Sequence, residues 1–291
     1  MAGSMNHILF FGFGFSAEAL TRRLDPAQWR ITGTSRSEEG AARLRARGVN
    51  GICFDALNDI PGDVTHVVSS VPPGDSGDPV LMRFGAALQR QAHSLTWAAY
   101  LSTTGVYGDH GGAWIDEATA LTPNTERGRR RLAAEEAWLR LHRLNGLPLH
   151  IFRLAGIYGP GRNQLETVLD GTAKRIIKEG QVFSRIHVDD IAGILLASMA
   201  RPHPGTAYNV ADDDPCPPQD VVEHAAELLG KPVPPAIAFA DAELSPMARS
   251  FYADSKRVAN RRVKVELGYR FLYPSFREGL AALLPGAGKP Q

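Results

Sequence analysis

Short apolar runs alternate along the chain with longer stretches whose apolar residues recur at helical spacing. The apolar runs predict strands at His7–Phe11, Trp29–Thr34, Gly51–Phe54, His66–Val71, Thr96–Leu101, Leu149–Leu154 and Ala207–Val210. The helical spacing predicts helices at Glu18–Leu24, Glu38–Gly48 and Val80–Ala92. Strands that alternate with helices in this way form a parallel sheet covered on both faces. The chain is therefore predicted to be a doubly wound α/β protein.

The later part of the chain is less regular and predicts a small C-terminal lobe. Helices are expected at Pro218–Leu229 and Arg249–Val258, with a proline-marked loop, Pro232–Pro235, between them. The lobe would close over the carboxyl ends of the strands, where open α/β sheets bind ligands. The predicted boundaries are 5–162 and 185–211 for the sheet domain, and 163–184 and 212–291 for the lobe.

A glycine-rich turn joins the first predicted strand to the first helix. Residues Gly12 to Ala17 (GFGFSA) form the pattern G-x-G-x-x-A, which indicates dinucleotide binding when it lies between a strand and a helix. Gly12 would allow the tight turn, Gly14 would let a pyrophosphate approach the backbone, and Ala17 would keep the helix close to its strand. The helix N-terminus, at Phe15 and Ser16, would offer amide hydrogens to the phosphates.

The end of the second strand favours NADP over NAD. An acidic residue at this place in a doubly wound fold binds the ribose hydroxyls of NAD, whereas an arginine accommodates the phosphate of NADP. This strand runs into Ser35 and Arg36, and the next acids, Glu38 and Glu39, fall in the following turn or helix. We therefore expect NADP, with NAD possible. The alternative is that Arg36 is a solvated surface arginine.

Composition narrows the class of protein further. The formal net charge of +1 over 291 residues favours neither nucleic acid nor a membrane surface as a partner. Cys53 and Cys216 lie far apart and outside any metal or redox spacing, so we expect a reduced, cytoplasmic protein. No apolar run approaches the length of a membrane span, and none indicates a signal peptide. Met1–Ser4, before Met5, look like a cloning remnant.

Further segments carry a family resemblance. They are LSTTGVYGD (101–109), PNTERGRRRLAAE (123–135), FRLAGIYGPGR (152–162), RIHVDDIA (185–192), YNVAD (208–212) and ELGYRFLYP (266–274). In this order, and together with the glycine motif, they resemble the extended short-chain dehydrogenase/reductase superfamily, specifically its NAD-dependent epimerase/dehydratase group. The resemblance implies a Rossmann domain that binds NAD(P). It also implies that the C-terminal lobe receives a nucleotide-sugar or another small hydroxylated substrate.

The resemblance assigns roles to individual residues. Thr103 falls where the family places its catalytic Ser or Thr; the alternative is a strand-end hydroxyl that bonds only to backbone. Arg153 matches a segment that passes near the nicotinamide, and Asp55 matches an acidic residue that meets the adenine. Ser70 and Val71 lie where the fourth strand meets the cofactor.

The family's catalytic pair, Tyr-x-x-x-Lys, has no counterpart. Aligning Leu132–Glu135 with the family places Arg127 at the tyrosine position and Arg131 at the lysine position. The family's tyrosine exchanges a proton with the substrate oxygen, and its lysine lowers the tyrosine's pKa and binds the nicotinamide ribose. Arg127 stays protonated near neutral pH and cannot act as a base, whereas Arg131 could still hold the ribose. An ordinary epimerase in another register would need a tyrosine near residue 127, and none lies between Tyr107 and Tyr158.

Two functions stay open. One is an atypical NAD(P)-dependent oxidoreductase or epimerase-like enzyme with a small-molecule substrate, in which Thr103, Arg127 and Arg131 form the catalytic site. The other is a non-catalytic NAD(P)-binding sensor or regulatory protein. Arg127 and Arg131, four residues apart, share one face of a helix. Two guanidinium groups on that face would suit a phosphate or carboxylate ligand. The alternative is that this helix face is solvated and binds no ligand.

Two smaller expectations complete the picture. Members of the family often dimerise through the helices that flank the sheet, so a homodimer is possible. We predict no metal, because Asp189 or Asp190 should cap a helix that begins at Ile191.

Overall fold

A seven-stranded parallel sheet with the order β11-β7-β5-β4-β1-β2-β3 forms the Rossmann fold. In this computed structural model the strands are β1 (Asn6–Phe11), β2 (Trp29–Ser35), β3 (Asn50–Cys53), β4 (His66–Ser69), β5 (Trp97–Thr103), β7 (Leu149–Leu154) and β11 (Ala207–Val210). The chain runs outward from β1 to β3 and then returns to the other side of β1 with β4, which confirms the doubly wound fold. The structure describes residues 5–284 and 286. The expected cloning remnant, residues 1–4, lies outside them, as do 285 and 287–291.

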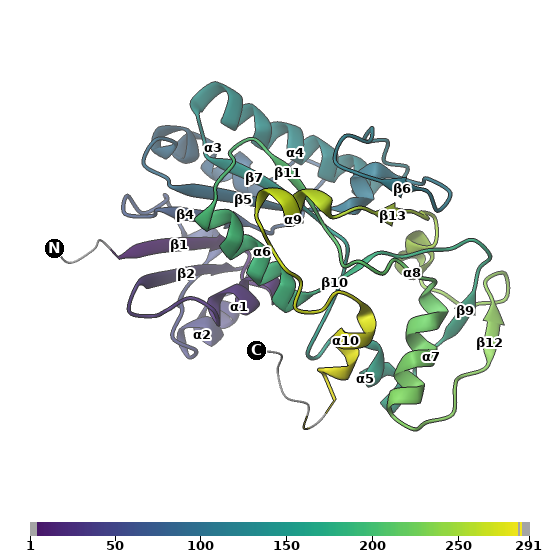
Figure 1. The fold of residues 1–291 in the computed structure, drawn as a ribbon. Coiled ribbons are helices and arrows are strands. Elements are labelled where there is room, and N and C mark those ends of the chain that lie inside the picture. The colour runs from purple at the N-terminus through teal and green to yellow at the C-terminus, as the bar shows by residue number, and fades with distance from the viewer. Residues whose placement is uncertain (1–4, 285, 287–291) are drawn as a thin grey trace. The chain divides into compact units, whose positions relative to one another are not determined.

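Helices cover both faces of this sheet (Figure 1). They are α1 (Phe15–Thr21), α2 (Glu38–Arg45) and α6 (Val188–Ala200) on one face, and α3 (Pro79–Gln91) and α4 (Glu126–Asn145) on the other. Two residues of β5 show why both faces are apolar. Trp97 donates its indole N–H to Ser198 of α6 at 3.0 Å, and Tyr100 stacks on Trp138 of α4 at 5.7 Å between ring centroids. Side chains three apart on a strand point to opposite faces, so β5 is buried on both.

The start of α3 illustrates local sequence control. Asp78 caps this helix by accepting hydrogen bonds from the amides of Val80 and Leu81 at 2.8 and 3.0 Å, and Pro79 occupies the first turn. The other carboxylate oxygen of Asp78 accepts the indole N–H of Trp138 at 3.1 Å. One buried carboxylate therefore begins α3 and also ties α4 to it.

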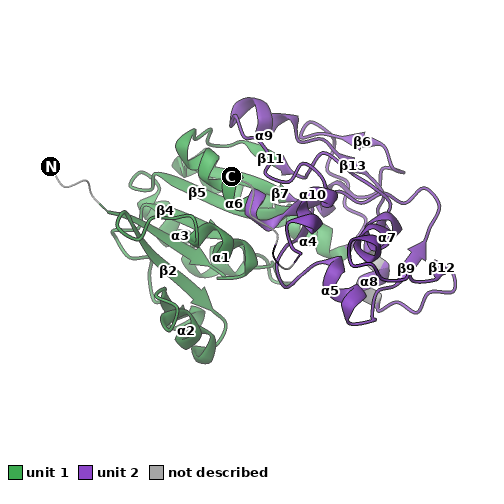
Figure 2. Cartoon of the chain, turned by 60° about the horizontal axis from the view of Figure 1, so that its bottom comes forward, with its two compact units in different colours: residues 1–103, 126–153, 191–208 green, residues 104–125, 154–190, 209–291 purple. Residues whose placement is uncertain are grey.

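The chain divides into two compact units (Figure 2). Unit 1 comprises residues 1–103, 126–153 and 191–208, and unit 2 comprises 104–125, 154–190 and 209–291. Compared with the predicted domains, residues 104–125, 154–162, 185–190 and 209–211 group with the C-terminal residues. Unit 1 holds the glycine turn and every residue to which a cofactor or catalytic role was assigned from the sequence.

Unit 2 is built from short elements. Its strands pair in parallel twos, β10 (Arg185–His187) with β8 (Gly156–Tyr158), β12 (Ala236–Ala238) with β9 (Arg175–Ile177), and β13 (Arg257–Val258) with β6 (Trp114–Ile115). Its helices are α5 (Gln164–Leu169), α7 (Pro218–Leu228), α8 (Pro246–Phe251), α9 (Arg261–Glu266) and α10 (Phe276–Ala281). Its apolar core joins α5, α7 and α10 around Leu165, Val221 and Phe276.

The predicted helix Arg249–Val258 is wrong over most of its length. Helix α8 ends at Phe251, and the chain then extends into β13. Contacts distant in sequence override the local helical spacing: the amide of Ser255 donates to the carboxylate of Asp109 at 2.7 Å, and the hydroxyl of Ser255 donates to the carbonyl of Gly180 at 2.9 Å. Such contacts are not visible in a periodicity.

Within the described part of the chain, no helix has both the length and the apolar character required to cross a bilayer.

Candidate NAD(P) site

Backbone and hydroxyl groups hold the glycine turn from both sides. The amide of Gly12 donates to the hydroxyl of Thr34, on β2, at 2.9 Å, and the hydroxyl of Ser70, just after β4, donates to the carbonyl of Gly12 at 2.7 Å. Gly12 has a φ of +82°, and a Cβ there would lie 3.0 Å from the Ser70 hydroxyl and 3.3 Å from a methyl of Val71. Only glycine fits this conformation without strain. Ser70 and Val71, which the resemblance assigns to the cofactor site, lie against the turn itself.

Thr34 and Gly33, to which the sequence assigned no role at the turn, also shape it. Thr34 is buried and, besides the bond to Gly12, its carbonyl accepts the amide of Phe13 at 3.0 Å. The Phe13 ring lies over Gly33, where a Cβ would approach the ring to 2.5 Å. A glycine inside a strand often marks such a close approach, so Gly33 within the predicted strand Trp29–Thr34 could have indicated this contact.

The start of α1 presents open amides. Gly14 is the N-cap, no side chain caps the helix, and a Cβ on Gly14 would meet nothing within 4 Å. The first intrahelical bond runs from the amide of Glu18 to the carbonyl of Gly14 at 2.9 Å. The amides of Phe15, Ser16 and Ala17 therefore precede the helical ladder. Open space above a bare backbone, next to uncapped amides, fits the pyrophosphate of a dinucleotide.

The ends of β2 and β3 form the neighbouring surface. Ser35 pairs with Cys53 in the sheet register, so the next residues, Arg36 and those of the 3-10 turn Phe54–Ala56, leave adjacent strands. Arg36 is exposed and makes no ion pair with any described residue. Asp55, in the turn, is exposed, and its carbonyl accepts from Arg83 at 2.7 Å.

The residues with predicted catalytic roles lie at the end of β5 and the start of α4. Thr103 is half-buried as the last residue of β5, and Arg127 is exposed in the first turn of α4. Arg131 is only 7% exposed, and its guanidinium donates to the hydroxyl of Tyr100 and the carbonyl of Leu101, both at 3.1 Å. The two arginines lie on the same helix, but Arg127 is exposed to solvent and Arg131 is buried.

Tyr100 is a poor candidate for the proton-transfer role that the resemblance gives to a tyrosine. Its phenol contacts a cation, as the family's catalytic tyrosine does, but it is fully buried against Trp138. Burial raises the pKa of Tyr100 above its ordinary value, and the opposing charge of Arg131 does not offset this. A phenol with a raised pKa and no access to solvent is a poor proton donor near neutral pH.

A buried ion pair lies beside these residues. Arg153 donates to the carboxylate of Glu135 through Nε at 3.2 Å and Nη2 at 2.9 Å, and both residues are at least 95% buried. The hydroxyl of Ser102 donates to the same carboxylate. Arg153, which the resemblance assigns to the nicotinamide region, is therefore held by a buried carboxylate.

Two expectations fall in unit 2. Helix α6 begins at Val188 rather than Ile191, so the expected cap is wrong. The carboxylate of Asp190 instead accepts from the Tyr269 hydroxyl and from the amides of Leu272 and Tyr273 at 2.7 to 3.1 Å, and burial raises its pKa to about 6. Among the described residues no group of three or more His, Cys, Asp or Glu side chains is placed to hold a metal ion.

The model of the NAD dependent epimerase/dehydratase family matches residues 86–211, a span that contains β5, α4, β7 and α6. Over this span the chain is similar to that family.

Relatives of the chain cover nearly its full length. A protein of unknown function from Silicibacter pomeroyi is 53% identical, has a TM-score of 0.91, and covers 96% of this chain and 98% of its own. Protein YeeZ of Escherichia coli K12 is 27% identical over 289 residues, which are 93% of this chain and 97% of YeeZ. The dTDP-glucose 4,6-dehydratase of Bacillus anthracis, solved in complex with NAD, is 19% identical with a TM-score of 0.72 over 95% of this chain and 94% of its own. This last likeness is one of fold.

Proposed function

We propose that the protein is an atypical NAD(P)-dependent oxidoreductase or epimerase/dehydratase-like enzyme that acts on a small hydroxylated or nucleotide-sugar-type substrate. The observation that supports this most is the turn Gly12–Ala17, which Thr34 and Ser70 hold in place and which leaves the amides at the start of α1 open. A bound dinucleotide would supply a nicotinamide that donates or accepts a hydride. Its pyrophosphate would be held by the backbone of Gly14 to Ala17.

The adenosine end favours NADP in this proposal. Arg36 is exposed and without an ion pair among the described residues, so its guanidinium is available for a 2′-phosphate. Ser35 precedes it at the end of β2, and Asp55 lies on the turn after the neighbouring strand. NAD would lack the phosphate that Arg36 binds.

Thr103 would orient the substrate oxygen from the end of β5. Arg127 would supply positive charge at the mouth of the site, and it cannot take up a proton. The proton would therefore reach the substrate oxygen through a water molecule bound next to Thr103. Arg131 donates its hydrogen bonds to Tyr100 and Leu101, so it would have a structural role at this end of the site and would not take part in the reaction.

Calorimetric titration with NADP⁺ and NAD⁺, on the natural chain and on Arg36→Ala, tests the cofactor site. We expect micromolar NADP⁺ binding that weakens about tenfold in the variant, because one charge-assisted contact is lost. Arg30→Ala, at an exposed arginine within β2 that pairs with Asp63, is the control and should leave binding unchanged. If neither nucleotide binds, the proposed function is wrong.

The buried position of Arg131 favours a second candidate, a non-catalytic NAD(P)-binding regulator. The double variant Arg127→Tyr, Arg131→Lys separates the two candidates. Turnover that appears only in the double variant would indicate a site that has lost its chemistry. Turnover in the natural chain would favour the enzyme.

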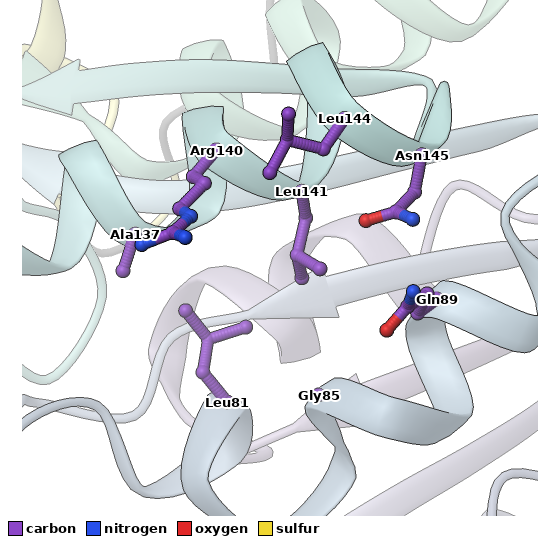
Figure 3. A pocket seen from close by; sticks show the side chains of 8 residues that line it. All are labelled: Leu81, Gly85, Gln89, Ala137, Arg140, Leu141, Leu144 and Asn145. Carbon is purple, nitrogen blue, oxygen red and sulfur yellow. The ribbon is translucent and has the colours of Figure 1, made fainter.

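We further propose that the chain forms a homodimer in the cytoplasm. A cavity of about 510 Å³ lies between α3 and α4, lined by Leu81 and Gly85 of α3 and by Leu141 and Leu144 of α4 (Figure 3). Leu144 is 67% exposed, and a second copy would cover it. The free cysteines, Cys53 and Cys216, fit a reducing compartment.

Analytical ultracentrifugation tests the dimer. Leu144→Glu places a charge in the proposed interface and should convert the dimer to a monomer. Leu169→Glu, at another exposed leucine, on α5, should not. A natural chain that sediments as a monomer at high micromolar concentration would rule the dimer out.

A further inference from the structure

Three aromatic rings of unit 2 form a half-buried cluster with three cations around it. Phe183, just before β10, lies 5.4 Å from Tyr252, just after α8, and Tyr252 lies 5.1 Å from Phe239, just after β12. The cations are Lys178, Arg185 and Arg249. We name this group of six residues the cationic aromatic patch. The rings and Lys178 and Arg185 are half-buried, and Arg249 is exposed.

The cations lie close to the rings. The guanidinium carbon of Arg249 and the Nζ of Lys178 are 5.1 and 5.3 Å from the centre of the Phe239 ring, and the guanidinium carbon of Arg185 is 5.9 Å from that of Phe183. Such contacts occur about once in 70–80 residues of a protein. Three of them on two rings of one cluster are a concentration of positive charge beside half-buried aromatic surface.

No described carboxylate is in direct ion-pair contact with these cations. None of the three cations makes an ion pair with a described residue; their hydrogen bonds go to the carbonyls of Ala242, Tyr252, Phe183 and Cys216 and to the Cys216 sulfur. Other cations of unit 2 are paired, such as Arg175 with Glu223 and Arg277 with Asp214. Three carboxyl groups lie within electrostatic range without pairing directly: Asp109 interacts with Lys178, and Asp212 and Asp220 interact with Arg185. Burial raises the pKa of Asp212 well above its ordinary value.

We propose that the cationic aromatic patch binds a compact aromatic carboxylate, a single aromatic ring that carries its carboxylate directly or on a short unsaturated chain. The ring would stack on the half-buried aromatic surface, and the carboxylate would take the charge-assisted hydrogen bonds of the arginines. The proximity of cations and rings favours this class. In a nucleotide the ribose separates the base from the phosphates, so its charge would lie away from the ring on which the base stacks.

As a binding site, the patch stands independently of the cofactor site in unit 1. The two are therefore measured separately, by titration with 4-hydroxycinnamate in one experiment and with NADP⁺ in another.

The ligand series uses the natural chain, so it does not depend on a variant that folds. Calorimetry or saturation-transfer NMR would compare 4-hydroxycinnamate with 4-hydroxycinnamamide, which lacks the charge, and with cyclohexanecarboxylate, which lacks the aromatic ring. We expect 4-hydroxycinnamate to bind at least tenfold more tightly than either. Equal affinities, no binding of 4-hydroxycinnamate, or tighter binding of uridine diphosphate would each overturn the proposal.

Variants then locate the site. Arg249→Gln and Phe239→Leu should each weaken 4-hydroxycinnamate five- to tenfold, because one removes a charge-assisted contact and the other a stacking surface. Arg270→Gln, at another exposed arginine of unit 2, is the matched control and should have no effect. Unchanged affinity in both folded patch variants would place the ligand elsewhere and refute the site. All three should keep NADP⁺ binding, so a failure of the patch is distinguishable from a failure of the cofactor site.

Discussion

The glycine turn and the start of α4 both lie in unit 1, but they are built in opposite ways. The turn is made of backbone groups, and two hydroxyls, of Thr34 and Ser70, fix it. The start of α4 depends on side chains, and one of its two marked arginines, Arg131, is directed onto Tyr100 and Leu101 in the interior. A backbone site is specified by where side chains are absent, whereas a side-chain site depends on packing that a motif does not record.

The largest effect on stability should come from the ion pair between Glu135 of α4 and Arg153 of β7. Glu135→Ala would leave the guanidinium of Arg153 buried without its partner, so we expect a loss of about 3–5 kcal/mol in the free energy of unfolding. Urea denaturation measures this loss. Glu136→Ala, the exposed neighbour on the same helix, is the control and should change stability by less than about 0.5 kcal/mol. A small change in the free energy of unfolding in Glu135→Ala would mean that this ion pair does not stabilise the packing of α4.

Next in size is a change at the turn that should spare stability. Gly14 has open space around its missing Cβ, so Gly14→Ala should fold normally, yet its methyl group would occupy the approach of a pyrophosphate. We expect NADP⁺ binding to fall about 10- to 100-fold, which is about 1.4–2.8 kcal/mol. Gly62→Ala, at another glycine with open space, is the control for calorimetry. Undiminished binding in Gly14→Ala would indicate that the turn does not hold the phosphates.

Burial of a histidine gives a pH-dependent prediction for the strands of unit 1. The pKa of His66 on β4 is lowered by burial from 6.5 to about 4, so between these values the unfolded chain binds more protons than the folded one. Its contribution to stability is complete above about pH 6.5 and is lost as the pH falls toward 4. His66→Phe should flatten the fall in stability between pH 6.5 and 4.5 by about 1–3 kcal/mol, measured by urea denaturation at both pH values. An unchanged slope would assign the acid sensitivity to other groups.

The sequence predicted the fold far better than it predicted the interior of the site. The strands Leu149–Leu154 and Ala207–Val210 have their predicted bounds because buried parallel strands are short, continuous apolar runs. The helix predicted at Arg249–Val258 failed because Ser255 bonds to Asp109 and Gly180, far away in sequence. The pairing of Glu135 with Arg153 could not be predicted either, because a charged residue on a helix is expected to be solvated unless the packing around it is known.

A smaller effect, about 0.5–1.5 kcal/mol, is expected where a hydroxyl supports the turn. Ser70→Ala removes the hydrogen bond to the Gly12 carbonyl without changing the backbone, and the methyl group is smaller than the side chain that it replaces. NADP⁺ binding should weaken about two- to fivefold because Gly12 is less firmly held, while stability falls by no more than this bond contributes. Ser94→Ala, at an exposed serine that bonds to the carbonyl of Gln91, is the control. Stronger binding in Ser70→Ala would mean that the turn is more effective when it is free.

The smallest structural effect, and the one that most sharply divides the turn from α4, is expected at Arg127. Its side chain is exposed, so Arg127→Gln should change the free energy of unfolding by less than about 0.5 kcal/mol and leave NADP⁺ binding intact. If Arg127 supplies charge to the substrate, the same variant should lower kcat/KM at least tenfold once a turned-over substrate is known, with Arg129→Gln as the neighbouring exposed control. A variant that keeps full turnover would leave α4 with a purely structural role. The site would then consist of the backbone turn and Thr103, and α4 would contribute no catalytic side chain.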